Sequence, residues 1–433
     1  MAGPQKCDAA AVTAVALDRT GVLLLDGDKS FPIGFSEPPP VGGTTPSGVP
    51  ALDELRNAGG TMIRVGPHDF ATPSAGGEWS LAQIDDQIAK VKARMDDALK
   101  HQMHCWLYLG TAPNLPGPDP PKNEQLLEKI VGAFKDHPSL VAYKGYDEPV
   151  NGGIKAPGLV TAHDRIKQLD PKHPVVIIQA PKKPASAFTA YRPAFDITGV
   201  DIFPIAYPPE QHSDSANKDI SVVGDMAKKM TTAAGGKPVW LTLQIAWSGS
   251  ARSKSKPGVL PCFPTLFQER FMVFDAIVNG ARGLTFFGGH MTHVCSPEDA
   301  GHGWNWSFWR QALKPVVTQL GSDDLRPALL APNAADKITV TGARDIQLVA
   351  RRSGRFLWVI AVKTGPSGVS NVTFGGLPAG IKKGEALFEW VQVPPPRPFD
   401  PSKQTHRPVT VANRKFSDLF RPHDVHVYRF RTS

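Results

Sequence analysis

The chain has 433 residues, of which 41% are hydrophobic and 20% are charged, and its formal net charge is +8. This apolar content excludes an intrinsically disordered chain, and the absence of an apolar run of ~20 residues excludes an integral membrane protein. The 42 prolines and 40 glycines follow no Gly-X-Y period, so they indicate many turns rather than a collagen-like fibre.

The basic charge is spread in short pairs such as Lys182 and Lys183, without a basic helix or an Arg-rich arm. This pattern favours an ordinary solvated surface, and we expect neither a nucleic-acid nor a membrane partner. Four cysteines are too few for a disulfide scaffold, although Cys262 and Cys295 lie in polar loops where a bridge between them stays open. The first 21 residues have no long apolar segment and are not a signal peptide as written. We expect a secreted or periplasmic protein from which a signal has been removed.

Short apolar runs alternate with amphipathic helical patterns in the first three quarters of the chain. Each run is rich in Val, Ile, Leu or aromatic residues, as expected of strands that are buried on both faces. The eight runs are Phe31–Phe35, Thr61–Val65, His104–Leu109, Val141–Tyr146, Val175–Gln179, Ile197–Phe203, Val239–Gln244 and Gly283–Phe287. Helical segments separate most of them, and no Gly-rich dinucleotide turn follows the first run. Eight such units predict a (β/α)8 barrel rather than an open doubly wound sheet.

The remaining organisation follows from the turn signals. Residues Gly21–Pro32 have the pattern of a hairpin around Asp26-Gly27, which we expect to close the bottom of the barrel. After residue 333 about seven strand patterns follow one another without a convincing helix, and this predicts an all-β sandwich. We therefore expect an N-terminal extension (1–21), a barrel (22–332) and a C-terminal β-sandwich (333–433).

Barrel active sites lie at the carboxyl ends of the strands, so the residues that end each predicted strand are the candidate site. They are carboxylates, amides, cations and aromatic rings: Arg64, His68, Asp147, Glu148, Gln179, Asp201, Tyr207, Gln244, Trp247, His290 and Trp304. Sugars present apolar faces and hydroxyl edges, which this mixture of rings and hydrogen-bonding groups suits. The rim has no phosphate-binding loop, no HExxH motif and no serine elbow, and no zinc-type ligand set accompanies His290. We expect a carbohydrate substrate and neither a metal nor a cofactor.

Four segments resemble clan A glycoside hydrolases, and within that clan a bacterial branch with Asp-Glu-Pro at the fourth strand. These segments are DGDKSFPIGFS, HPSLVAYKGYDEP, GKPVWLTLQ and RFMVFDAIVNGARGLTFFG. The resemblance covers about residues 22–325, and it implies a (β/α)8 barrel, commonly followed by a β-sandwich. It also implies that Glu148 is the general acid/base and that Asp147 replaces an asparagine that binds the substrate 2-hydroxyl. Arg64 is similar to a strand-two arginine that supports the catalytic carboxylates.

The resemblance fails at the seventh strand, where the nucleophilic glutamate of the clan maps to Gln244. An amide cannot attack an anomeric carbon as a carboxylate does, so three alternatives stay open. Another carboxylate assists Glu148, with Asp147 and Asp201 nearest by strand position and Asp69, Glu298 and Asp299 in loops. Alternatively the substrate supplies its own nucleophile, oriented by Gln244 or Asp147, or the barrel binds glycans without cleaving them. A retaining enzyme needs two carboxyl groups about 5–5.5 Å apart and an inverting enzyme about 6.5–9.5 Å.

We predict a glycosidase that cleaves an O-glycosidic bond in an oligo- or polysaccharide, with Glu148, Asp147 and Asp201 as catalytic candidates. A carbohydrate-binding barrel without turnover is the alternative. Structural roles are the alternative for several of these residues: Asp201 could cap a turn, Arg64 could form a structural ion pair, and Trp304 could pack in the interior.

Overall fold

The computed structural model describes residues 11–67, 78–115, 120–205, 213–245, 263–288, 296–390, 400 and 403–432. The chain forms two compact units. The first comprises residues 1–202, 229–246 and 283–307, and the second comprises residues 203–228, 247–282 and 308–433.

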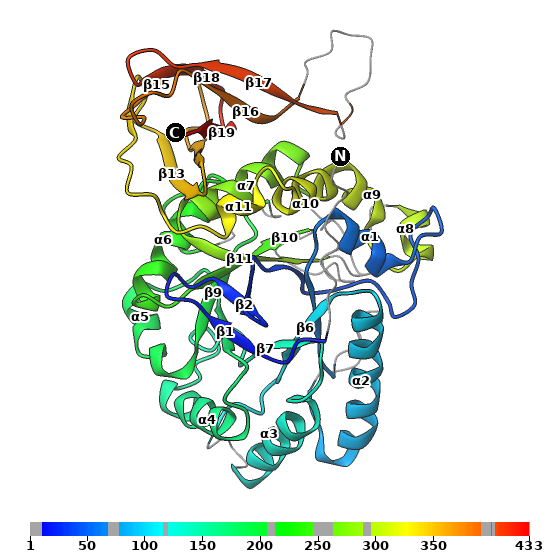
Figure 1. Ribbon diagram of the computed structural model, residues 1–433. Helices are drawn as coiled ribbons and strands as arrows, with labels where there is room; N and C mark the ends of the chain where they lie inside the picture. Colours follow the sequence, from blue (N-terminus) through cyan, green and yellow to red (C-terminus); the bar gives the residue numbers. More distant parts are fainter. Residues whose placement is uncertain are drawn as a thin grey trace, which may run out of the picture. The chain divides into compact units, whose positions relative to one another are not determined.

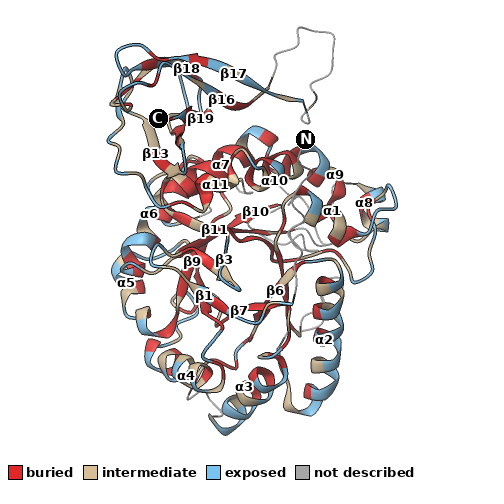
Figure 2. Cartoon of the chain, viewed as in Figure 1, coloured by how far each residue is buried: buried red, intermediate tan, exposed pale blue. Residues whose placement is uncertain are grey.

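Eight parallel strands close into a barrel in the first unit, as the sequence predicts (Figure 1). They are β4 (Ile33–Phe35), β5 (Met62–Val65), β6 (His104–Tyr108), β7 (Leu140–Lys144), β8 (Val175–Gln179), β9 (Ile197–Asp201), β10 (Val239–Gln244) and β11 (Ala281–Phe287). Their order is β10-β11-β4-β5-β6-β7-β8-β9. Most of their residues are buried, so the continuous apolar runs reflect strands with protein on both faces (Figure 2).

The predicted hairpin is part of a small antiparallel sheet made of β1 (Val15–Leu17), β2 (Leu23–Leu25) and β3 (Asp28–Ser30). Val15 and Leu23 from this sheet pack with barrel residues that include Trp106 and Trp240. The hairpin thus packs against the apolar interior of the barrel, as expected. The strand β1 has only three residues, and the sequence pattern did not reveal it.

Helices follow the strands in chain order. In the first two thirds they are α1 (Ala51–Ala58), α2 (Ile84–Lys100), α3 (Pro120–Phe134), α4 (Ala156–Leu169), α5 (Ala185–Thr189) and α6 (Val222–Ala234). Later come α7 (Leu266–Val278), α8 (Pro297–Gly301), α9 (Trp306–Phe308), α10 (Lys314–Gly321) and α11 (Arg326–Leu329). Short 3-10 turns lie at Leu81–Gln83 and Arg192–Ala194, and a π-helical segment lies at Trp309–Leu313. No helix among the described residues is long and apolar enough to cross a membrane.

Two antiparallel sheets form the C-terminal β domain. One contains β12 (Thr339–Thr341), β15 (Ser370–Gly375) and β18 (Phe416–Phe420), in that order. The other has the order β13-β14-β19-β16-β17, with bounds Ile346–Ser353, Phe356–Lys363, Val425–Arg431, Lys383–Trp390 and Gln404–Thr410. Both sheets contribute buried residues to one core, including Phe374, Phe416, Tyr428 and Phe430. The predicted all-β class is confirmed, but the sequence missed β18.

Candidate active site

Glu148 lies in the loop that follows β7, at the carboxyl end of the barrel strands. Its backbone N–H donates to the carbonyl of Ile178 on β8 at 2.9 Å, and its own carbonyl accepts from Gly152 at 3.0 Å. These bonds hold Glu148 at a φ of 45°, in the left-handed region that a non-glycine residue rarely adopts. Strain of this kind persists where the surrounding structure fixes the backbone, and it is common at active sites.

Asp201 ends β9, the strand next to β8, and the Glu148 backbone is bound to β8 through Ile178, so the two carboxyl groups lie close enough to interact electrostatically. Burial raises the pKa of Asp201 well above its ordinary value, and the neighbouring carboxyl groups of Glu148 and Asp147 add to the effect. Asp201 is therefore the member of the pair that retains a proton. Glu148 is partly exposed, and its other neighbour is the amide of Asn151, whose Nδ2 donates to Oε2 at 3.3 Å. The structure thus places two of the three predicted catalytic carboxyl groups close enough for the charge of one to act on the other.

Asp147, the third predicted carboxyl group, is paired with a residue that the sequence analysis did not select. The Nζ atom of Lys144, at the end of β7, lies 2.6 Å from Oδ1 of Asp147. The lysine side chain is 4% exposed, whereas the aspartate side chain is 42% exposed. Asp147 can therefore meet a substrate while one of its oxygens contacts a buried cation.

Arg64 and Tyr108 complete the wall around Lys144. The Tyr108 ring centroid lies 4.4 Å from the Lys144 Nζ and 5.5 Å from the Arg64 Cζ, so both cations contact this ring. Arg64 is buried on β5 and Tyr108 ends β6, as expected for inward-facing residues of adjacent strands. Tyr108 is the last residue of β6 and the next-to-last residue of the predicted run His104–Leu109, so a rule based on strand ends could have found it.

Glu78 is a second carboxylate that the sequence analysis missed. Its Oε2 accepts hydrogen bonds from the backbone N–H of Thr111 at 2.9 Å and from the Thr111 hydroxyl at 2.8 Å. Burial raises the pKa of Tyr146, and the charges of Glu78 and Asp147 contribute to that shift. Glu78 therefore lies on the Tyr146 side of the site. Glu78 lies at the end of no predicted strand, so the rule that selected the other candidates could not find it.

The two amides of the predicted site are buried. Gln179 is 0% exposed, and its Oε1 accepts from the N–H of Val150 at 3.4 Å, so it supports the loop that carries Glu148. This burial contradicts its predicted contact with substrate. Gln244, at the end of β10, is also 0% exposed, and the stretch from Val239 to Ile245 contains no carboxylate. The missing strand-seven nucleophile is thus not replaced by a neighbour on that strand.

Trp304 does not fit the predicted role in substrate binding. It is 1% exposed, and its Nε1 donates to the carbonyl of Glu37 at 2.8 Å. Its ring packs edge-on against Phe35 and Trp306, so it belongs to the interior. Of the loop carboxylates, Asp299 is buried and accepts from the N–H of Ser307 at 2.9 Å, which makes it a structural acceptor.

Several predicted residues lie outside the part of the chain that the structure describes. They are His68, Asp69, Tyr207, Trp247 and His290, and the open question of a bridge between Cys262 and Cys295 falls there as well. The described residues contain no group of three or more His, Cys, Asp or Glu side chains that could hold a metal ion.

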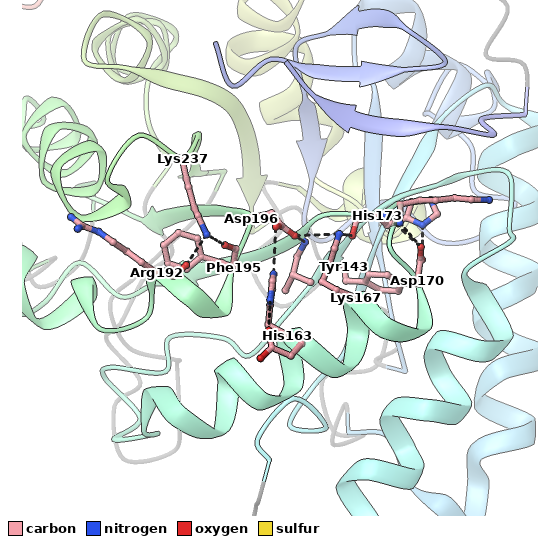
Figure 3. Close-up of polar contacts among 12 residues, drawn as sticks. Tyr143, His163, Lys167, Asp170, His173, Arg192, Phe195, Asp196 and Lys237 are labelled. Carbon is pink, nitrogen blue, oxygen red and sulfur yellow. Dashed lines mark hydrogen bonds and ion pairs between the residues drawn. The ribbon is translucent and has the colours of Figure 1, made fainter. Parts of the chain in front are cut away.

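A second polar cluster lies at the opposite end of the strands, around the residues that precede β8, β9 and β10 (Figure 3). The Tyr143 hydroxyl donates to Asp170 at 2.7 Å, and His173 Nδ1 lies 2.6 Å from the same carboxylate. Burial alone would raise the pKa of Asp170. The hydrogen bonds with His173 and Tyr143 outweigh this effect and lower the pKa to about 2. Asp196 likewise accepts from the N–H of Val175 at 2.9 Å. Polar groups that are satisfied in this way at the amino ends of barrel strands indicate a stabilising role.

No protein-family model and no curated protein matches the sequence. Solved structures do match over almost the whole chain. A family 5 glycoside hydrolase from Bacteroides vulgatus is 12% identical with a TM-score of 0.64, over 97% of this chain and 94% of its own. A second glycoside hydrolase is 12% identical with a TM-score of 0.61, over 97% of both chains. A family 30 endoxylanase from Clostridium papyrosolvens is 11% identical with a TM-score of 0.51, over 97% of this chain and 100% of its own.

These matches show that the chain shares its fold with these glycoside hydrolases. At this identity they show the fold alone, since one barrel can carry many chemistries.

Proposed function

We propose that the protein hydrolyses an O-glycosidic bond in an oligo- or polysaccharide, with Glu148 as the general acid/base. The observation that carries this proposal is the placement of Glu148, bound to β8 through Ile178, beside Asp201 at the end of the adjacent strand β9, at the carboxyl end of the barrel. Two carboxyl groups that interact in this way cannot both ionise easily, so one proton is retained near neutral pH. A general acid needs such a proton.

The three carboxyl groups take different roles in this reaction. Glu148, which is partly exposed, passes the proton that the pair stores on Asp201 to the leaving oxygen. Asp147, paired with Lys144, serves as the base that takes a proton from the attacking water or orients a group of the substrate. Water then adds its oxygen to the anomeric carbon, and the leaving sugar departs as an alcohol. The raised pKa of Asp201 favours its protonated form, which is a poor nucleophile, so Asp201 is assigned to proton storage rather than to attack.

A glycan library assayed by product NMR tests the activity, and Glu148→Gln tests the assignment. We expect the amide to lower kcat/KM by about 10²- to 10⁴-fold, the usual contribution of a general acid. Asp85→Asn, an equally isosteric change at an exposed position of α2, is the control and should leave kcat/KM unchanged. Activity that persists within a few-fold in Glu148→Gln contradicts the acid assignment. Binding without cleavage in the wild-type protein would instead favour the non-catalytic barrel.

A further inference from the structure

Lys144 is the most deeply buried cation around the candidate site. It is the last residue of β7, and its Cα pairs in register with that of Tyr108 on β6. The whole residue is 3% exposed, and the ammonium group lies between the Asp147 carboxylate and the Tyr108 ring. Lysine is rarely buried to this degree unless its charge is paired, because removing an ammonium group from water is costly. The chain therefore tolerates a substantial desolvation penalty at this position.

The groups that face Lys144 come from β5, β6, β9 and the loop after β7. Arg64 on β5 and Lys144 both contact the ring of Tyr108 on β6, while Asp147 and Asp201 attract the charge of Lys144. Glu148 acts on Asp201 through its charge, and Glu78 and Tyr146 act in the same way on Tyr108. Four carboxyl groups and two cations thus form one electrostatic cluster. Within it, Lys144 forms an ion pair with Asp147 at 2.6 Å.

We propose that Lys144 is a positioning residue of this site, whose ammonium group neutralises Asp147 and so leaves a single shared proton to Glu148 and Asp201. This inference rests on the same residues as the proposed glycosidase activity. Without the ammonium group, the charge of Asp147 would act unopposed on the two neighbouring carboxyls. The cluster would then hold its protons to a higher pH, and Asp147 itself would become a proton acceptor in competition with Glu148.

The cluster can be titrated directly, without a substrate. The full-length protein labelled with ¹³C at the Asp and Glu side-chain carboxyls is followed by NMR as a function of pH, for the wild type, Lys144→Met and Lys144→Arg. We expect Lys144→Met to move the titration midpoints of the Glu148 and Asp201 carboxyls upward by about one pH unit or more, the usual effect of losing one nearby opposite charge. Lys144→Arg, which restores the charge, should return them toward the wild-type values.

Lys363 provides a matched control. It is also a strand-end lysine, 2% exposed, and it forms an ion pair with Asp345 in the C-terminal domain. Lys363→Met removes a buried ion-paired lysine of the same kind, so it should lower stability without moving the Glu148 and Asp201 midpoints. A shift of equal size in this control would show that the effect is structural and would overturn the inference.

Asp147→Asn tests the same pair from the other side and keeps the inference falsifiable if Lys144→Met does not fold. Removing the negative charge should move the Glu148 and Asp201 midpoints downward, opposite to Lys144→Met. Midpoints that stay at the wild-type values in a folded variant overturn the role of Lys144. Because the readout is proton binding, a protein that cleaves no glycan would refute the proposed hydrolysis and leave this result standing. Where hydrolysis is found, the acid limb of kcat/KM should shift in the same direction as the midpoints.

Discussion

Asp201 and Asp170 belong to the same barrel, but their environments shift their pKa values in opposite directions. Asp170 accepts hydrogen bonds from His173 and Tyr143, and its pKa falls to about 2. Asp201 lies near the carboxyl groups of Glu148 and Asp147, and its pKa rises well above the ordinary value. The first arrangement favours the ionised form and stabilises the fold. The second stores a proton and works against folding at neutral pH, as is common for residues kept for chemistry.

Asp201→Asn should therefore stabilise the protein in a pH-dependent way. A carboxyl whose folded-state pKa is raised contributes stability that is present below about pH 3.9 and is lost as the pH rises through the folded value. The amide carries no charge, so thermal unfolding should show a midpoint above that of the wild type at pH 8 and close to it at pH 4. An equal difference at both pH values would contradict the raised pKa. Glycan hydrolysis should fall in the same variant, because Glu148 loses its proton source.

At the scale of single elements, the barrel depends on close contact between β9 and β10. Gly199 pairs in register with Trp240, and a Cβ atom at this glycine would lie 1.7 Å from the Trp240 carbonyl oxygen. No side chain can be accommodated at that distance without moving a strand. The position of Asp201, two residues further along β9, depends on this register.

Gly199→Ala should consequently destabilise the protein by at least about 3 kcal/mol, the upper range for overpacking a core. Gly132→Ala is the matched control, since nothing lies within 4 Å of a Cβ at this position of α3. Alanine there should instead stabilise the helix by about 0.5–1 kcal/mol. Chemical denaturation of both variants measures the difference. Similar stabilities for the two would show that β9 and β10 are not held as closely as described.

On the scale of the whole molecule, the helix α7 belongs with the C-terminal strands. It packs against β13, β14 and β19 within the second compact unit. Arg270 of α7 is buried, and its guanidinium donates to the Val425 carbonyl at 2.7 Å and to Gln319 Oε1 at 3.0 Å. The β domain therefore covers a helix that lies between two barrel strands in the sequence.

A fragment that ends at residue 332 should accordingly fail to fold as a stable monomer. It retains α7 but lacks every strand that α7 packs against in the second unit, which leaves apolar surface exposed. Size-exclusion chromatography and thermal unfolding of the fragment and of the full chain measure this. A monomeric fragment with the unfolding midpoint of the full chain would contradict the expectation.

A milder change tests the same contacts in the full chain. Arg270→Met should lower the unfolding midpoint, because the carbonyl of Val425 and the amide of Gln319 lose their buried partner. Arg352→Met removes an ion pair with Asp336 in which the arginine side chain is 37% exposed, and it should change the midpoint little.

The barrel strands were predictable because parallel strands with protein on both faces appear as continuous apolar runs. The strand β18, with the sequence FSDLF, escaped prediction because its polar residues serve partners elsewhere in the domain. Asp418 of that strand accepts a hydrogen bond from the Tyr428 hydroxyl at 2.9 Å. Its pattern was therefore that of a loop.

Only those site residues that lie at or directly after the ends of predicted strands could be predicted from the sequence. Position in the chain placed Glu148 and Asp201 on one rim, but a sequence contains no signal for the electrostatic interaction between them. Trp304 was placed on the surface because tryptophan suits both a sugar platform and a core. Lys144 was missed because it lies within an apolar run, where a cation carries no pattern of its own.

The positive φ angle at Glu148 predicts which amino acids would replace glutamate under selection for stability alone. Glycine or asparagine adopts a φ of 45° more readily than glutamate does. In a library that varies position 148 freely, enrichment for thermostability alone should favour these two amino acids over glutamate. Enrichment for growth on the natural glycan should favour glutamate. The difference in glutamate frequency between the two selections would measure how strongly this position is retained for chemistry.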